Sequence, residues 1–209
     1  MTAAPSTSHR SDDRAIDPLE RVAAVLRSHR IEVVIVATGA DARRAVLDMI
    51  PPGAEIHSGK SKTLEDVGLY AEIVESGRYD ALRPKMFKMD RQTQGREIRK
   101  LVAAPDFMLG SVAAVTEDGA LVAASATGSQ LGSYAAGAGR LILVVGSQKI
   151  VPDLDAAMQR IREVVFPWEN ARVRERLGVD TVLAKVLLIY GEWLAGRTTV
   201  VLVREHVGV

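Results

Sequence analysis

Three short segments rich in small and hydroxyl residues follow apolar stretches of the chain: SGKSKT (58–63), SATGSQ (125–130) and GSQK (146–149). Small residues leave backbone N–H groups open to a ligand, and N–H groups at a helix start beside a lysine attract anions. We therefore expect a phosphate or a carboxylate to bind across these three segments. Helix capping by glycine and serine, with no ligand, is the alternative interpretation of each segment.

The first two segments and two lysines supply the residues that we expect to bind the anion. Lys60 and Lys149 would provide positive charge, and the N–H groups near Gly59 and Gly128 would surround the ligand. The expected anion-binding residues are Ser58, Gly59, Lys60, Ser61, Thr63, Thr127, Gly128, Ser129 and Gln130. The stretch GAEIHSGKS does not match a P-loop, because five residues separate Gly53 from Gly59 where that motif has four. A nucleoside triphosphatase is therefore excluded.

Glu117 and Lys149 are the residues that we expect to act in catalysis if the protein is an enzyme. Glu117 lies in TEDG directly after an apolar run, where a carboxylate could move a proton or attack a carbonyl. A solvated turn acid is the alternative for Glu117. His57 ends a predicted strand beside the first segment, where it could contact a ligand or serve the structure alone. The four histidines have no metal-ligand spacing, so we expect no metal site.

The composition of the 209-residue chain limits its partners and cofactors. Its formal net charge is +1, which gives no reason to expect nucleic acid or a membrane surface as a partner. The chain has no cysteine, which excludes disulfides, a thiol nucleophile and an iron-sulfur cluster of its own, and we expect no cofactor. With no signal-peptide core and no apolar stretch of membrane-spanning length, the sequence predicts a cytoplasmic protein.

Hydrophobic periodicity predicts alternating strands and helices in residues 17–209, after a flexible N-terminal tail formed by residues 1–16. Asp118-Gly119 between two apolar runs predicts a hairpin, and Asp17 followed by Pro18 predicts a helix start. Helices are expected at 17–30, 41–50, 64–75, 91–102 and 152–165, and strands at 31–37, 54–57 and in the apolar runs within 107–125, 140–146 and 184–205. This order predicts a single α/β domain, a three-layer α/β/α fold with a mixed, mainly parallel sheet, whose ligands bind beyond the carboxyl ends of the strands.

Three longer segments carry a resemblance to a known family. SGKSKTLEDVGL, SVAAVTEDGALVAASATGSQ and AGRLILVVGSQKIVPDLDAAMQRI resemble the LUD domain, the lactate-utilisation (LutC/YkgG-like) domain of bacterial organic-acid metabolism, and the resemblance runs from about residue 19 to the C-terminus. It implies the NagB/RpiA/CoA-transferase-like fold, which glucosamine-6-phosphate deaminase, ribose-5-phosphate isomerase and CoA transferases share. The positions that match the family's motifs are Gly59, Ser61, Thr63, Glu117, Thr127, Gly128 and Lys149.

The resemblance implies two alternative functions. In the first, the protein binds a small anionic metabolite, a hydroxy or keto acid or a sugar phosphate, and any enzyme chemistry would be isomerase-like or acyl-transferase-like by analogy of fold. In the second, it is a non-catalytic subunit that docks onto iron-sulfur redox proteins that oxidise lactate to pyruvate. The run TTVVLVRE (198–205) also predicts a homo-oligomer, if it forms an exposed edge strand that a second chain covers.

Overall fold

A computed structural model describes residues 17–209, and the tail predicted for residues 1–16 lies outside the described residues. The first helix, α1 (Pro18–Ser28), begins where the sequence predicts. The Asp17 side chain accepts a hydrogen bond from the Leu19 backbone N–H at 3.1 Å, and proline occupies the first helical turn. The start of this helix is therefore fixed by a side-chain cap.

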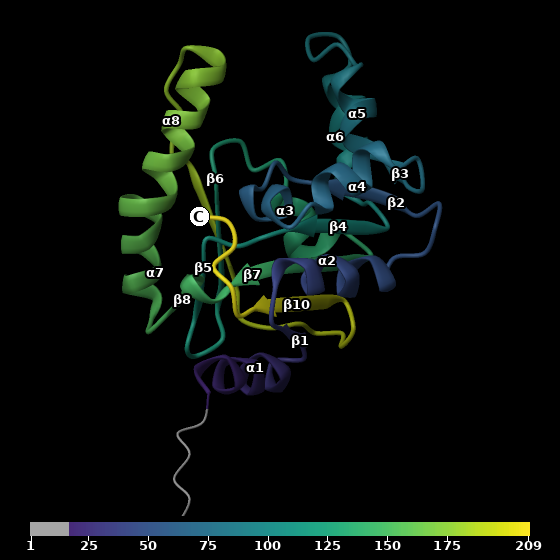
Figure 1. Cartoon of the computed structure of the whole chain (residues 1–209). Helices are drawn as coiled ribbons and strands as arrows, with labels where there is room; N and C mark the ends of the chain where they lie inside the picture. The colour runs from purple at the N-terminus through teal and green to yellow at the C-terminus, as the bar shows by residue number, and fades with distance from the viewer. Residues whose placement is uncertain (1–16) are drawn as a thin grey trace, which may run out of the picture.

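Six parallel strands form the central sheet, in the order β1–β10–β7–β4–β2–β3 (Figure 1). In chain order they are β1 (Glu32–Val36), β2 (Glu55–Ser58), β3 (Asp80–Ala81), β4 (Phe107–Gly110), β7 (Arg140–Gly146) and β10 (Thr198–Val203). Successive residues of β7 and β10 point to opposite faces, and nearly all of them are buried. Both faces of the sheet must therefore be covered, as is usual for parallel sheets.

Helices cover one face of this sheet. The helices between β1 and β4 are α2 (Gly39–Asp48), α3 (Lys62–Asp66), α4 (Leu69–Glu75), α5 (Leu82–Phe87) and α6 (Gly95–Ala103). Side chains of α2, α3 and α4 pack against Ile142 and Val144 of β7 and against Val201 and Val203 of β10. The sequence predicts one helix over 64–75, but the chain divides it at Gly68, which has a φ of 73°.

The opposite face is covered by α1 and by a second, four-stranded sheet. Its strands, in spatial order, are β8 (Ile150–Val151), β5 (Ala114–Thr116), β6 (Leu121–Ser125) and β9 (Lys185–Ile189). The hairpin predicted at Asp118-Gly119 is confirmed, because β5 and β6 pair in antiparallel fashion with Val115 opposite Leu121. Gly119 has a φ of 87°, a backbone conformation that favours glycine in such a turn.

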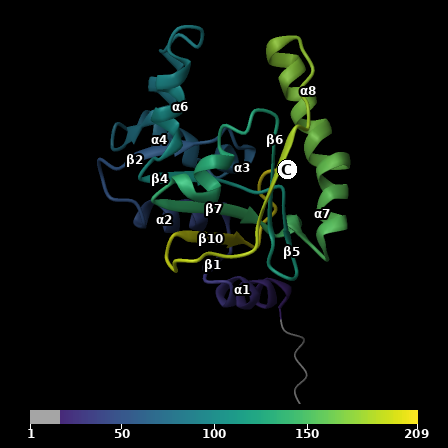
Figure 2. The ribbon, with the colours of Figure 1, turned by 180° about the vertical axis from the view of Figure 1, so that it is seen from behind.

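An outer helical layer stands against the second sheet (Figure 2). It consists of α7 (Leu154–Arg160), the π-helical turn η3 (Ile161–Val165) and α8 (Phe166–Leu177). Ala157 and Ile161 are fully buried against Ala114 and Val122 of the sheet. The helix predicted for 152–165 continues through the π-helical turn η3 into α8, which carries Pro167 in its first turn.

The predicted α/β architecture, a mainly parallel sheet within helical layers, is confirmed. The antiparallel pairs belong to the second sheet. The condition attached to the predicted self-association, that 198–205 forms an edge strand, is not met, because β10 lies between β1 and β7, with Val200 opposite both Val33 and Leu143. An exposed edge strand at 198–205 therefore no longer supports self-association, which stays a prediction.

The carboxyl ends of β2, β4, β7 and β10 lie at one edge of the central sheet, as parallel strands require. In Figure 1 the arrowheads of β7 and β10 point toward β5 and α7. The C-terminus lies between the central sheet and the outer helices α7 and α8. Segments 58–63 and 146–149 begin at this edge. The fold therefore positions two of the three predicted anion-binding segments side by side.

Candidate anion-binding site

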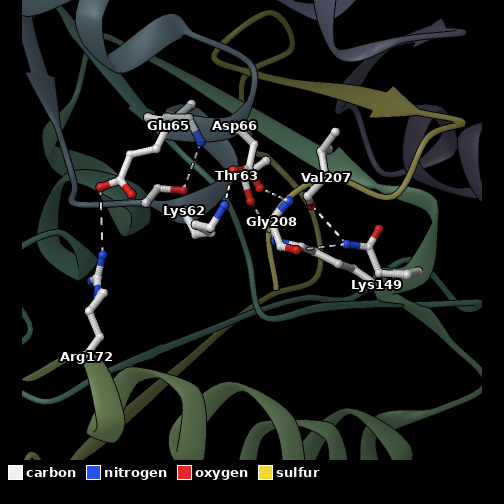
Figure 3. Close-up of polar contacts among 11 residues, drawn as sticks. Lys62, Thr63, Glu65, Asp66, Lys149, Arg172, Val207 and Gly208 are labelled. Atoms are coloured by element: carbon white, nitrogen blue, oxygen red, sulfur yellow. Dashed lines mark hydrogen bonds and ion pairs between the residues drawn. The ribbon is translucent and has the colours of Figure 1, made fainter.

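The amine of Lys149 lies buried at the carboxyl edge of the central sheet, with 3% of the residue exposed. Its Nζ donates hydrogen bonds to Thr63 Oγ1 at 2.8 Å, to Ser111 Oγ at 3.0 Å and to the Val112 carbonyl at 3.3 Å. Figure 3 shows Thr63 and Lys149 close together beside Gly208. All three acceptors are uncharged, so among the described residues the amine is held without an ion pair.

Three neighbouring strands bring these groups together. Thr63 belongs to α3, which follows β2, and Ser61 caps this helix by accepting a hydrogen bond from a backbone N–H. Ser111 comes directly after β4, and Lys149 ends the short 3-10 turn η2 (Ser147–Lys149) after β7. Because β2, β4 and β7 are neighbours in the sheet, residues that are 86 positions apart in the chain share a hydrogen bond.

The surroundings of Lys149 favour its neutral form. Burial is the main cause that lowers the pKa of its amine to about 7, and the positive charge of Arg160 lowers this pKa further. The charge of Asp66 acts in the opposite direction. However, the Asp66 carboxylate is already paired with Lys62 and accepts a hydrogen bond from the Gly208 N–H at 3.0 Å. A substantial fraction of the Lys149 amine is therefore unprotonated at neutral pH.

Arg160, the last residue of α7, is a second cation near this amine. Its Nε and Nη2 atoms are buried, and within residues 17–209 neither has a hydrogen-bond partner. Burial lowers the pKa of its guanidinium, and its charge acts on Lys149. Buried polar atoms in folded proteins are nearly always hydrogen-bonded. Two free donors on one guanidinium fit a carboxylate or a phosphate that binds between them.

Helix α8 brings further positive charge to the first segment. Arg172 reaches from α8 toward Glu65 of α3, with 3.8 Å between Nη1 and Oε1 (Figure 3). Its guanidinium lies 4.8 Å from the centroid of the Trp168 ring, a cation–π contact. Burial lowers the pKa of Lys60, and the charges of Arg172 and Arg176 lower it further. Glu65 and Glu169, which both pair with Arg172, act on Lys60 in the opposite direction, so the first segment is lined by charges of both signs.

The chain that follows β10 lies across the cluster. The Val207 carbonyl accepts a hydrogen bond from Gln148 Nε2 at 2.9 Å, next to Lys149 in the chain. Gly208 has a φ of 78°, and a Cβ atom at this position would lie 2.0 Å from Thr63 Oγ1 and 3.1 Å from Lys149 Nζ. Only a glycine fits here, so this segment covers the amine with backbone in direct contact.

The second segment, 125–130, makes its hydrogen bonds elsewhere. The Gly128 N–H donates to Ser125 Oγ at 2.9 Å, and Lys185 Nζ of β9 donates to the Ala126 carbonyl at 3.4 Å. Thr127 and Ser129 are exposed. Within the described chain, none of the hydrogen bonds of this segment extends to the first segment or to Lys149. The structure thus brings together two of the three predicted segments.

The start of the first segment holds a second group of unpartnered buried atoms. His57 is 3% exposed, and its Nδ1 has no partner among the described residues. Burial, followed by the charge of Arg83, lowers the pKa of His57 to about 4, so its ring is neutral at neutral pH. Arg83 Nη1 donates to the Ser58 carbonyl at 3.3 Å. The Gly59 N–H, expected to face an anion, instead donates to the Leu109 carbonyl of β4 at 3.3 Å.

Glu117 lies exposed at the turn of the β5–β6 hairpin. Its N–H donates to the Val151 carbonyl at 2.9 Å, and the following Gly119 packs so closely on α1 that a Cβ atom would lie 2.9 Å from His29 Nδ1. Val151 is two positions after Lys149, so the two backbones are near each other, but within the described residues Lys149 Nζ bonds to Thr63, Ser111 and Val112 and not to Glu117. The structure shows Glu117 exposed at the turn and, among the described residues, without a hydrogen bond to Lys149, and this exposure favours the interpretation as a solvated turn acid.

Two other kinds of site are absent from the part of the chain that the structure describes. None of the helices between residues 17 and 209 is long and apolar enough to cross a membrane. Over the same residues, no three histidine or acidic side chains gather closely enough to hold a metal ion. Among these residues, the groups around Lys149 are the hydroxyls of Thr63 and Ser111, the cation Arg160 and a single acid, Asp66.

A family model described as the LUD domain matches residues 19–182, most of the chain. The chain belongs to the LUD-domain family. This family is associated with lactate utilisation. The four polar residues of the cluster, Thr63, Ser111, Lys149 and Arg160, all lie within the part of the LUD domain that matches, whereas Gly208 follows it.

The fold of this LUD domain is similar to that of a solved structure. The crystal structure of a DUF162 family protein from Deinococcus radiodurans, at 1.70 Å resolution, matches with a TM-score of 0.50. The two chains are 14% identical, and the match covers 89% of this chain and 95% of that chain. At this identity the likeness shows the fold alone. No curated protein matches the LUD domain described here.

Two residues of the cluster in this LUD domain were missed by the sequence reasoning. Ser111 is a small hydroxyl residue directly after a strand, so the rule that found the first segment also applies to it, but FMLGS was assigned to the hairpin region. Arg160 carried no such signal, because it lies on a helix with an arginine two positions later. Only the packing of α7 against the second sheet distinguishes the two arginines, since Arg162 is exposed.

Proposed function

We propose that this LUD-domain protein binds a small anionic metabolite of lactate-type organic-acid metabolism at the carboxyl ends of β2, β4 and β7. The ligand would be a hydroxy or keto acid or a sugar phosphate. The observation that carries the proposal is the pair of cations at this edge, Lys149 and Arg160, neither of which has an acidic partner among the described residues. The cytoplasmic location expected from the sequence is part of the same proposal.

Lys149 is buried and Arg160 is half-buried, so both cations are at least partly removed from water. Removing a cation from water is unfavourable unless an opposite charge or hydrogen-bond acceptors replace the water. Lys149 has three neutral acceptors, but Arg160 has two buried donors with none. A bound carboxylate or phosphate would accept from both Arg160 donors and would lie in the positive field of both side chains.

The proposed binding residues differ in part from those expected from the sequence. Thr63 and Lys149 are kept because they form the centre of the cluster, and Ser111 and Arg160 are added because they face the same amine or lie near it. Lys60 is kept as a source of charge at the first segment. The segment 125–130 and Glu117 are left out of the proposed site.

Isothermal titration calorimetry of the full chain tests this proposal, with lactate, pyruvate, a pentose phosphate and inorganic phosphate as ligands. Arg160→Gln should weaken the binding of the preferred anion by about tenfold or more, because a charge-assisted hydrogen bond is lost. Arg162→Gln is the matched control, since it removes an exposed arginine from the same helical segment. The proposal fails if no anion binds, or if the two variants lose affinity equally.

Docking onto an iron-sulfur redox protein is the second candidate, and exposed apolar side chains along an edge strand favour it. β9 is the outermost strand of the second sheet, and Val182, Val186 and Tyr190 on or beside it are 61%, 38% and 55% exposed. Such a strand can accept a partner's strand or a hydrophobic surface. Val186→Asp should then abolish co-purification of an iron-sulfur protein while leaving anion binding unchanged. Co-purification that survives this substitution, or that never occurs, would exclude β9 as the docking surface.

A further inference from the structure

The hydrogen-bond partners of Lys149 can serve either the ammonium ion, which donates to all three acceptors, or the neutral amine, whose lone pair can accept from one of the two hydroxyls. A lysine that serves as a structural cation normally pairs with a carboxylate, whereas Lys149 Nζ donates to two hydroxyls and one carbonyl. The hydroxyls of Thr63 and Ser111 are themselves 3.2 Å apart and hydrogen-bonded. Two groups that can both give and accept protons therefore lie beside an amine that is buried from water.

We propose that Lys149 forms an imine with the carbonyl carbon of a 2-oxo acid, whose carboxylate is held by Arg160. This inference rests on the proposed anion site and narrows its ligand class. A lysine can attack a carbonyl only in its unprotonated form, and burial in an apolar environment is a known way of producing that form. The lowered pKa of Lys149, about 7, means that unprotonated amine is present at neutral pH.

The presence of two cations in one region favours the 2-oxo acid class. In such an acid the carbonyl carbon and the carboxylate are directly bonded, so the groups that recognise them must be neighbours. Arg160 is close enough to Lys149 for its charge to lower the pKa of the amine, and its Nε and Nη2 are buried without partners in the described chain. A guanidinium with two free donors binds a carboxylate bidentately, which would orient the adjacent carbonyl toward the amine.

The reaction balances without any oxidant or reductant. The lone pair of Lys149 Nζ attacks the carbonyl carbon, and the carbonyl oxygen takes up a proton to give a carbinolamine. Loss of the hydroxyl group as water, together with the second proton of the amine, leaves the carbon–nitrogen double bond. Thr63 Oγ1 and Ser111 Oγ, at 2.8 Å and 3.0 Å from Nζ, are placed to pass these protons.

Access to the amine requires movement of the chain around Gly208, because a Cβ atom at this position would lie 3.1 Å from Lys149 Nζ. Two hydrogen bonds hold this part of the chain in place. Gln148 Nε2 donates to the Val207 carbonyl, and the Gly208 N–H donates to the Asp66 carboxylate. Gly208→Ala would force the segment away from Thr63. This variant should therefore form the imine faster than the wild type.

Reductive trapping tests the inference on the full chain. The protein is incubated with pyruvate and sodium cyanoborohydride, and the reduced adduct is located by peptide mass spectrometry. We expect one dominant adduct on Lys149, loss of that adduct in Lys149→Arg, and no loss in the control Lys185→Arg, which alters the exposed lysine of β9. Adducts spread evenly over many lysines, or none on Lys149, would overturn the inference.

Arg160→Gln separates recognition of the carboxylate from reactivity of the amine. This variant should trap pyruvate at least about tenfold more slowly. Trapping of acetaldehyde, which has the carbonyl but no carboxylate, should change little. An equal loss with both carbonyl compounds would show that Arg160 does not hold a carboxylate. If pyruvate binds by calorimetry but no adduct forms on Lys149, the imine is excluded while the anion site stands, and if pyruvate does not bind, both fail.

Discussion

The segments 58–63 and 125–130 have nearly the same chemistry in the sequence and different surroundings in the structure. Each offers glycine, serine and threonine after an apolar stretch. The first follows β2 of the parallel sheet, and its Thr63 meets Lys149 at the buried carboxyl edge. The second follows β6, whose two neighbours in the second sheet are antiparallel to it, and its Thr127 is exposed.

This difference indicates that the sheet to which a strand belongs decides whether the polar residues of the loop after that strand form a site. Neighbouring parallel strands all end at the same edge, so the residues after β2, β4 and β7 converge. An antiparallel neighbour runs the other way, so the residues that follow β6 meet β9 and make hydrogen bonds within their own segment. Three predictions test this contrast between the two segments and the sheets that carry them.

The largest expected effect is the dependence of stability on pH that Lys149 introduces. The folded state has an amine pKa of about 7, and the unfolded state has the usual value of 10.5. Between these values the unfolded chain binds one proton more, so the free energy of unfolding should rise with pH by up to about 1.4 kcal/mol for each pH unit. Below about pH 7 both states are protonated, and this contribution becomes constant.

Urea unfolding of the wild type and of Lys149→Met across this range measures the effect. The difference between the two free energies of unfolding should change with pH, because the methionine variant has no amine to titrate. The matched variant Lys185→Met, beside the second segment, should follow the wild-type slope, since this side chain is in contact with water. Parallel pH profiles for the wild type and Lys149→Met would show that the amine keeps its proton in the folded state.

The next effect compares one substitution in both segments. Thr63→Val keeps the shape of a fully buried side chain but removes the acceptor that lies 2.8 Å from Lys149 Nζ, which should lower the free energy of unfolding by about 1–3 kcal/mol. Thr127→Val changes an exposed side chain and should alter the free energy of unfolding by less than about 0.5 kcal/mol. The midpoints of denaturant unfolding of the two variants measure these changes. Equal losses of stability would contradict the proposed difference between the two segments.

Much of the fold was predictable because local signals agree with the tertiary structure. The β-branched run Glu32–Val36, the cap at Asp17 and the turn at Asp118-Gly119 each form the predicted element. The sheet that a strand joins was less predictable, because pairing is decided by distant residues. The run Thr198–Val203, whose place in the sheet the sequence left open, lies inside the sheet with all six of its residues buried.

The site was predictable in part for the same reason. Thr63 and Lys149 stand directly beyond parallel strands, where a sequence rule applies, and that rule also covers Ser111. The position of Arg160 is decided by the packing of α7 against the second sheet, and no short segment of the sequence predicts that packing. The covering of Lys149 by Gly208 joins residues far apart in the chain and has no local signal.

The smallest expected effect concerns Glu117, which the sequence marked as catalytic and the structure places on the turn of the antiparallel sheet. Glu117→Gln should leave the free energy of unfolding within about 0.5 kcal/mol, because the side chain is exposed and its hydrogen bond to Val151 is made by the backbone. Pyruvate binding and trapping should also stay at wild-type values. Ser111→Ala is the comparison, because it removes a hydroxyl that lies 3.0 Å from Lys149 Nζ and should slow trapping several-fold. If Glu117→Gln slowed trapping more than Ser111→Ala, a carboxylate from the second sheet would have to reach the amine, and the assignment of the site to the parallel sheet alone would be wrong.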